Sequence, residues 1–235
     1  MRSKVVREER GTAIAVGGLY VLATAAGVAA LLVGAPTEAS AMADRSGAVL
    51  VTALLVAVMA VAVAGVGVMF YPVLARDAGG HAWRGAAFGF AGARVAEGAI
   101  FLVYVAAIVA VLGLGEAFSG AEGIRAAAYE AAGLALQTFS QYAMIAAQTA
   151  FCVGAAVMYV LLYRSRRVPR WLSVWGLVAT PLMLVAGFTL PFTNDPNSTV
   201  STVLYMPMAV QEMVLAVWLI AFGLRPAVAT AAVIA

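Results

Sequence analysis

The sequence contains too few charged residues to cover a water-soluble fold. Asp, Glu, Lys and Arg make up only 11% of its 235 residues, against roughly a quarter in soluble domains. Apolar residues make up 64%, and the mean hydropathy is +0.99. A soluble fold of this length needs a polar surface. The composition therefore excludes a soluble protein and predicts an integral membrane protein.

Cysteine and histidine are almost absent. Cys152 lies within an apolar segment, so the sequence has neither a disulfide framework nor a Cys-x-x-Cys site. His81 is the only histidine and lies in a loop. We therefore expect no metal site and no tetrapyrrole or other cofactor, because the usual ligands are missing. The motifs of serine hydrolases, zinc proteases, P-loops and Rossmann folds are absent as well.

Six apolar segments are each long enough to cross a bilayer, which takes about 20 residues. They are continuous and rich in Ala, Leu and Val, which favours helices over alternating strands. The sequence thus predicts an all-α fold, a transmembrane helical bundle that forms a single integral membrane domain over residues 1–235. The expected helices cover residues 11–33, 47–74, 84–114, 137–163, 171–190 and 201–224. Residues 121–136 are expected either to extend the fourth helix or to lie along the membrane interface.

The basic residues are distributed unequally between the two sets of loops. Eleven fall on the side of the termini, namely Arg2, Lys4, Arg7, Arg10, Arg76, Arg84, Arg164, Arg166, Arg167, Arg170 and Arg225. The other side carries two, Arg45 and Arg125. Since cytoplasmic loops are enriched in Lys and Arg, both termini are predicted to be cytoplasmic. The net charge of +3 favours contact with membrane lipids and gives no reason to expect nucleic-acid binding.

Three charged residues interrupt the apolar segments. Arg94 and Glu97 lie near the middle of the third segment, three residues apart and therefore on one face of a helix. Glu212 lies at the midpoint of the sixth segment. Each charge at mid-bilayer costs roughly 2.5–3.5 kcal/mol on insertion scales, so such residues are rarely accidental. Their comparable depth predicts that they meet, and they are our candidate catalytic residues.

Uncharged polar residues extend this prediction to the fourth segment. Gln141 and Gln148 share one face of that segment. The other candidate ligand-binding residues lie near the charges: Tyr104 on the face of Glu97, Tyr205 on the face of Glu212, and Gln211 beside Glu212. The third, fourth and sixth helices are therefore expected to line a polar pocket, and the first, second and fifth to form apolar walls. Glycines at the start of the third helix, Gly85 and Gly89 among them, are expected to allow close helix packing.

The charge count has a chemical consequence. One arginine faces two carboxylates. The net charge of the site is therefore zero only if one of Glu97 and Glu212 is ionised and the other is protonated. The other carboxylate is expected to hold a proton and could act as a general acid, a proton carrier or the partner of a cationic ligand.

Three stretches resemble an uncharacterised bacterial membrane family. These are LLYRSRRVPRWLSVWG at residues 161–176, AVQEMVLAVWLI at residues 209–220, and YPVL at residues 71–74 followed by Arg94 and Glu97. The family is catalogued as domain of unknown function 4386. The resemblance implies a multi-pass protein of the bacterial plasma membrane and carries no known activity. It also implies that Gln211 and Glu212 belong to a motif typical of the family.

Three functions fit these observations. The first is a buried site for a small amphiphilic or lipid-like molecule, which as an enzyme would isomerise or cyclise it by acid catalysis. The second is a proton-coupled carrier of small solutes, for which six helices would require a homodimer. The third is a structural or interaction protein whose buried charges only set the register of the helices.

Overall fold

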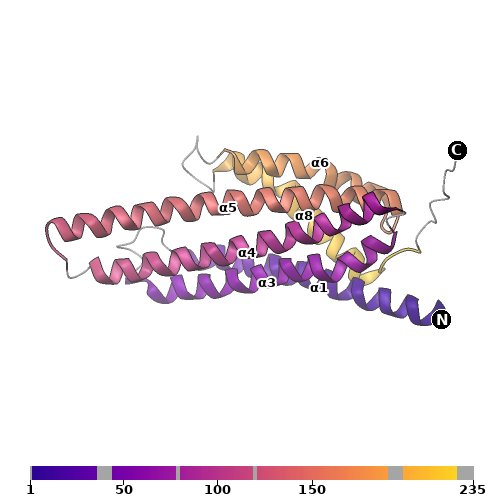
Figure 1. The fold of residues 1–235 in the computed structure, drawn as a ribbon, viewed down its shortest axis with the longest axis horizontal. Helices are drawn as coiled ribbons and strands as arrows, with labels where there is room; N and C mark the ends of the chain where they lie inside the picture. Colours follow the sequence, from indigo (N-terminus) through magenta and orange to yellow (C-terminus); the bar gives the residue numbers. More distant parts are fainter. Residues whose placement is uncertain (1, 36–43, 78–79, 119–120, 190–197, 227–235) are drawn as a thin grey trace. The chain divides into compact units, whose positions relative to one another are not determined.

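The computed structural model describes residues 2–35, 44–77, 80–118, 121–189 and 198–226, which form helices and short connections without any strand (Figure 1). The six helices are α1 (Arg2–Val33), α3 (Ser46–Asp77), α4 (His81–Phe118), α5 (Ile124–Ser165), α6 (Arg170–Gly187) and α8 (Thr199–Ala221). This confirms the predicted all-α fold.

All six helices are long and apolar enough to span a membrane. Large apolar side chains point outward from them, such as Leu54 and Val61 of α3, which are 66% and 68% exposed. In water such a surface would aggregate, whereas in a bilayer it contacts lipid tails. The chain is therefore a multi-pass integral membrane protein whose helices contact lipid.

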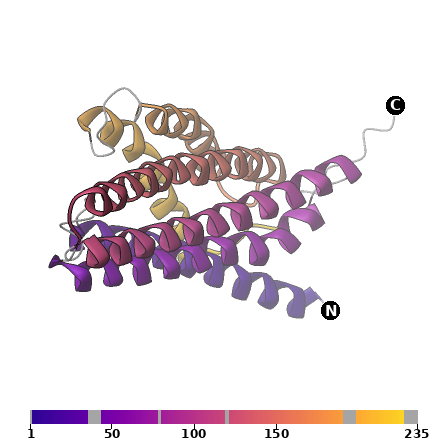
Figure 2. The ribbon, with the colours of Figure 1, turned by 60° about the vertical axis from the view of Figure 1, so that its left-hand side comes forward.

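Two helix boundaries differ clearly from the prediction. Helix α1 begins at Arg2, because charged residues such as Arg and Glu are good helix formers and allow the helix to extend beyond its apolar part. Helix α5 runs for 42 residues without a break (Figure 2), so residues 124–136 extend it and the interfacial alternative is wrong. The predicted end of the fifth helix at residue 190 lies outside the described residues.

The helices contribute to two compact units, each with its own core. Unit 1 combines residues 1–21, 63–97 and 148–235, and unit 2 combines residues 22–62 and 98–147. The core of unit 1 includes the fully buried rings of Phe70, Phe90 and Tyr159, and that of unit 2 includes Val49, Val111 and Leu112. The three charged residues of the apolar segments, Arg94, Glu97 and Glu212, all belong to unit 1.

Within unit 1 the closest helix contacts occur at glycines. A methyl group added at Gly67 of α3 would lie 2.6 Å from Arg94 Cβ and 3.1 Å from the Ala91 carbonyl oxygen. By contrast, a methyl group at Gly85 or Gly89 would have no neighbour within 4 Å. The close packing expected at Gly85 and Gly89 is therefore wrong, and other glycines make the close contacts.

One end of unit 1 is held together by ionic contacts. Glu9 of α1 pairs with Arg76 of α3 at 2.5 Å and with Arg167, which follows α5, at 2.8 Å. Arg10 donates hydrogen bonds to the carbonyl oxygens of Ile220 (2.8 Å) and Ala221 (3.2 Å). These carbonyls lie in the last turn of α8, where they have no partner within the helix. We call this region the basic end of unit 1.

Candidate functional site

Arg94 and Glu97 form a buried ion pair on α4. The two residues are 2% and 4% exposed, and Arg94 Nη1 lies 2.9 Å from Glu97 Oε2. A single turn of helix brings them together, because positions three apart share a face. Burying both charges is costly, and the pair is stable only because each compensates the other.

The guanidinium of Arg94 lies among aromatic rings and glycines. Its carbon Cζ is 5.0 Å from the ring centroid of Phe151 and 5.8 Å from that of Tyr20, distances at which a cation is attracted to a ring face. Gly67 of α3 contacts the Arg94 side chain on one side, and Gly154 of α5 lies against α4 near Arg94 and Ala93 on another. Four helices, α1, α3, α4 and α5, thus position one arginine.

Glu212 lies on the inner face of α8. It is three or four residues from the fully buried Met208, Leu215 and Ala216, so it shares their side of the helix. Glu212 itself is only partly buried. It interacts electrostatically with both Arg94 and Glu97, so the three predicted charges do belong to one cluster.

Two buried polar atoms of this cluster lack hydrogen-bond partners among the described residues. They are the donor Arg94 Nε and the acceptor Glu97 Oε2, whose contact with Arg94 is close but not aligned as a hydrogen bond. The carboxylate of Glu212 likewise has neither a hydrogen bond nor an ion pair within the described residues. Buried polar groups are nearly always hydrogen-bonded, so the two buried atoms, Arg94 Nε and Glu97 Oε2, require an explanation, and the partly buried Glu212 is a third group without a partner in the described part of the chain.

The neighbouring tyrosines and glutamines, in contrast, are bonded to one another. Tyr159 of α5 donates to the amide oxygen of Gln211, whose amide nitrogen donates to the Leu172 carbonyl at 3.1 Å. This link joins α5 to α8 and α8 to α6.

A second link repeats this pattern with the two helices exchanged. Tyr205 of α8 donates to the amide oxygen of Gln148 of α5 at 2.5 Å, and the Gln148 amide nitrogen donates to the Met183 carbonyl of α6. In both links a glutamine accepts from a tyrosine and donates to α6. Their polar atoms therefore stabilise the packing of α5, α6 and α8.

Glycines of α6 make room for both links. A methyl group at Gly176 would lie 2.5 Å from the ring of Tyr159, and one at Gly187 would lie 2.6 Å from the amide of Gln148. The bulky polar side chains of α5 thus pack directly on the backbone of α6, which explains how they reach its carbonyl groups.

The predicted residues therefore fall into three groups. Arg94, Glu97 and Glu212 form the charged cluster, whereas Gln148, Gln211 and Tyr205 belong to the two links just described. Gln141 and Tyr104 are part of unit 2, where each is partly buried. The expectation of apolar walls is wrong for the first and fifth helices, because α1 contributes Tyr20 and α6 contributes the carbonyl acceptors.

Tyr20 is the residue that sequence reasoning missed. It is 2% exposed, its ring lies against Arg94, and its hydroxyl donates only to the sulfur of Met158, a weak acceptor, at 3.4 Å. The available signal was its depth, about 20 Å along the helix from Arg7 at 1.5 Å per residue, which is too deep for the interfacial belt.

Comparison with known proteins places the chain in a family. Residues 15–223 match the family model described as Domain of unknown function (DUF4386). The chain belongs to this family. No curated protein matches it, and no solved structure does.

The part of the chain that matches the DUF4386 model contains the whole charged cluster and the neighbouring Tyr20. Tyr20, Arg94, Glu97 and Glu212 all lie between residues 15 and 223, and so do the residues of both tyrosine–glutamine links. The family description assigns no activity, so a function has to be argued from the geometry of the cluster.

Proposed function

We propose that this protein binds a small amphiphilic molecule within the membrane, with the polar group of that molecule received by Arg94, Glu97 and Glu212. The observation that carries the proposal is the contrast between two sets of buried polar groups. The tyrosine–glutamine links are internally hydrogen-bonded, whereas among the described residues Arg94 Nε and the Glu212 carboxylate have no hydrogen bond and Glu97 Oε2 has only its ion pair with Arg94. A bound polar group that both donates and accepts would satisfy them.

Charge balance indicates which polar groups suit the site. Arg94 and Glu97 neutralise each other, so Glu212 contributes the net charge. An ionised Glu212 would attract a cationic group such as an amine, and a protonated one would donate to a hydroxyl or carbonyl oxygen. An amphiphile with an amine or alcohol head therefore fits better than one with an acidic head.

The partial burial of Glu212 supports access by a ligand. If the charges served only to fix helix register, the structure should pair all three, because an unpaired buried carboxylate is destabilising. Met208, Leu215 and Ala216, which share the face of Glu212, are nearly or fully buried, whereas Glu212 is only partly buried. This arrangement supports a binding role over a structural one.

The experiment uses three single-chain probes of equal length: decylamine, decanol and decanoic acid. We expect the purified protein to bind decylamine or decanol more tightly than decanoic acid, and Glu212→Gln to weaken the binding of the preferred probe about tenfold, as expected for the loss of one charge-assisted hydrogen bond. Glu130→Gln is the matched control, because Glu130 is an exposed residue of α5. Equal binding by wild type and Glu212→Gln, with both proteins folded, would refute the proposal.

If the protein is also an enzyme, Glu212 would catalyse the shift of a double bond in the bound molecule. A protonated Glu212 would donate its proton to a carbon–carbon double bond and leave a carbocation. Loss of a proton from the adjacent carbon to the Glu212 carboxylate would form a shifted double bond and regenerate the acid. Co-purified lipid incubated in D₂O should then acquire deuterium with wild type and not with Glu212→Gln.

The carrier alternative makes a different prediction for the same residue. A carrier would move its probe across proteoliposome membranes at a rate that depends on the pH gradient. Binding of decylamine without gradient-dependent flux would support binding and not transport. Gradient-dependent flux that Glu212→Gln abolishes would show instead that the protein is a carrier.

A further inference from the structure

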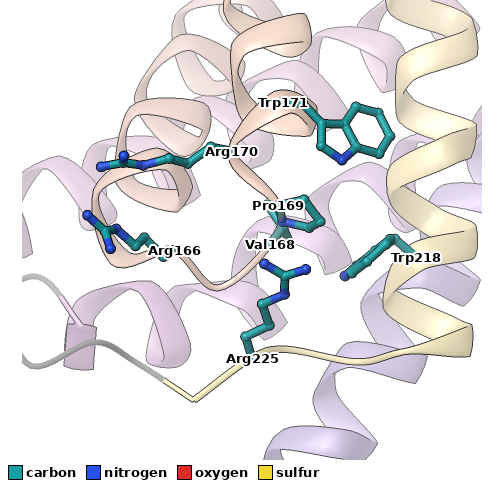
Figure 3. Close-up of a pocket in the computed structure, with 7 residues that line it drawn as sticks. All are labelled: Arg166, Val168, Pro169, Arg170, Trp171, Trp218 and Arg225. Carbon is teal, nitrogen blue, oxygen red and sulfur yellow. The ribbon is translucent and has the colours of Figure 1, made fainter.

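Three arginines line one pocket at the basic end of unit 1. The pocket has a volume of about 480 Å³ and is lined by Arg166, Val168, Pro169, Arg170, Trp171, Trp218 and Arg225 (Figure 3). No carboxylate is among these residues, and none of the three guanidinium groups forms an ion pair within the described part of the chain. Three arginines in the lining of one cavity, with no carboxylate among the lining residues, favour an anionic ligand.

Arg166 and Arg170 lie in and next to the short turn that connects α5 to α6. Arg166 adopts a left-handed backbone conformation with φ of 55° directly after α5, and Pro169 is the N-cap residue of α6. Figure 3 shows Arg166 and Arg170 on one side of the Val168–Pro169 turn and Trp218 on the other. A left-handed conformation is unusual for a residue other than glycine, so the sharp turn is maintained by its surroundings.

Arg225 is brought to the same turn by its backbone. The Arg225 amide donates to the Arg167 carbonyl at 2.8 Å, and Arg167 Nη1 donates to the Arg225 carbonyl at 3.0 Å. Arg167 also pairs with Glu9, which leaves it out of the pocket lining. Arg167 thus holds the turn together, whereas the guanidinium of Arg170 lies 4.8 Å from the Tyr163 ring centroid and that of Arg225 lies 5.4 Å from the Trp218 ring centroid.

Two further features suit an anion. Helix α6 begins at the pocket without a side-chain cap, and the amides of a helix N-terminus carry partial positive charge. The indole nitrogen of Trp218 is buried and has no hydrogen-bond partner among the described residues, so it can donate to a ligand. Trp171, which is 53% exposed, adds an apolar surface of the kind found where membrane meets water.

We propose that this pocket binds a phosphate group, to which Arg225 and Trp218 donate from one side of the turn while Arg166 and Arg170 add positive charge from the other. Guanidinium groups match phosphate oxygens in charge and in the spacing of their donors. The phosphate can belong to an acidic lipid headgroup, because basic pockets between transmembrane helices accept such headgroups, or to a free phosphate ion. This site is separate from the charged cluster around Arg94 and does not depend on its proposed role.

The test measures binding of three probes to the full-length protein in detergent: dihexanoyl phosphatidylglycerol, dihexanoyl phosphatidylcholine and inorganic phosphate. We expect phosphatidylglycerol or inorganic phosphate to bind at least about tenfold more tightly than phosphatidylcholine, whose choline neutralises its phosphate. The double variant Arg170→Gln/Arg225→Gln should weaken the binding of the preferred probe about tenfold or more.

The control variant removes two other arginines from the same end. Arg7→Gln/Arg84→Gln changes the net charge equally, and both residues are exposed and absent from the pocket lining. If the double variant of the pocket does not fold, Arg166→Asn replaces it, because asparagine tolerates a left-handed conformation. Preference for phosphatidylglycerol identifies a lipid headgroup, and preference for inorganic phosphate identifies a free ion. The proposal is overturned if no probe binds, or if the control weakens binding as much as the pocket variant.

Discussion

Apart from its ion pair with Glu97, Arg94 is positioned by residues that carry no charge. Gly67 and Gly154 allow α3 and α5 to approach α4 closely, and the rings of Phe151 and Tyr20 lie near its guanidinium. Arg94 and Glu97 were predictable from the sequence, because two opposite charges three residues apart in an apolar helix have few interpretations. The glycines were not, since whether a glycine faces a neighbour or open space depends on tertiary packing.

The substitution Gly67→Ala should therefore disturb the charged cluster. Its methyl group would lie 2.6 Å from Arg94 Cβ, so α3 or Arg94 must move. We expect a loss of about 1–3 kcal/mol in the free energy of unfolding, the usual cost of overpacking, together with weaker binding of the preferred C10 probe. Thermal unfolding in detergent measures the first effect and a binding titration the second.

Gly92→Ala is the matched control for this substitution. It lies on α4 near Arg94, and a methyl group there would meet nothing within 4 Å. Alanine is the better helix former by about 0.8–1.0 kcal/mol, so Gly92→Ala should be neutral or stabilising. Equal unfolding temperatures for the two variants would show that Gly67 does not control the position of Arg94.

Helices α5, α6 and α8 are joined by the two tyrosine–glutamine links rather than by apolar packing alone. Lipid tails are as apolar as the helix surfaces, so apolar contact gives little preference for one helix neighbour over another. Hydrogen bonds between helices supply that preference. The sequence indicated the glutamines, because amides are unusual in apolar helices, but not their acceptors, since any carbonyl along α6 was available.

The link through Tyr159 and Gln211 can be measured with a double-mutant cycle. Tyr159→Phe and Gln211→Leu should each lower the free energy of unfolding, and their coupling should be about 0.6 kcal/mol and at most about 1.7 kcal/mol, the range found for hydrogen bonds between membrane helices. Urea or thermal unfolding in detergent provides the four values.

The control cycle pairs Gln211→Leu with Tyr142→Phe. Tyr142 is 53% exposed and belongs to unit 2. We expect these two substitutions to be additive within about 0.3–0.5 kcal/mol. A coupling as large as that of the Tyr159 cycle would mean that the effects spread through the bundle and do not report the link.

At the scale of the whole molecule, the number and type of the spans followed from the sequence because they depend on composition alone. Six apolar runs produced six helices, and only their ends moved, where charged residues extended α1 and the segment after residue 124 joined α5. The orientation in the membrane is instead a prediction from loop charge. That prediction assumes that the basic loops lie on one side. In unit 1, Arg76, Arg167 and Arg225 do lie at one end, where Glu9 pairs with the first two.

Cysteine labelling tests the predicted orientation. In a Cys152→Ala background, Ala82→Cys places a thiol in the first turn of α4 on the predicted cytoplasmic side, and Glu122→Cys places one before α5 on the other side; both positions are exposed. A membrane-impermeant maleimide should label Glu122→Cys in intact bacterial cells and Ala82→Cys only after permeabilisation. The original chain is the blank, because Cys152 is 2% exposed. The reverse pattern would place the termini outside, and the arginine pocket would then face away from the anionic lipids of the cytoplasmic leaflet.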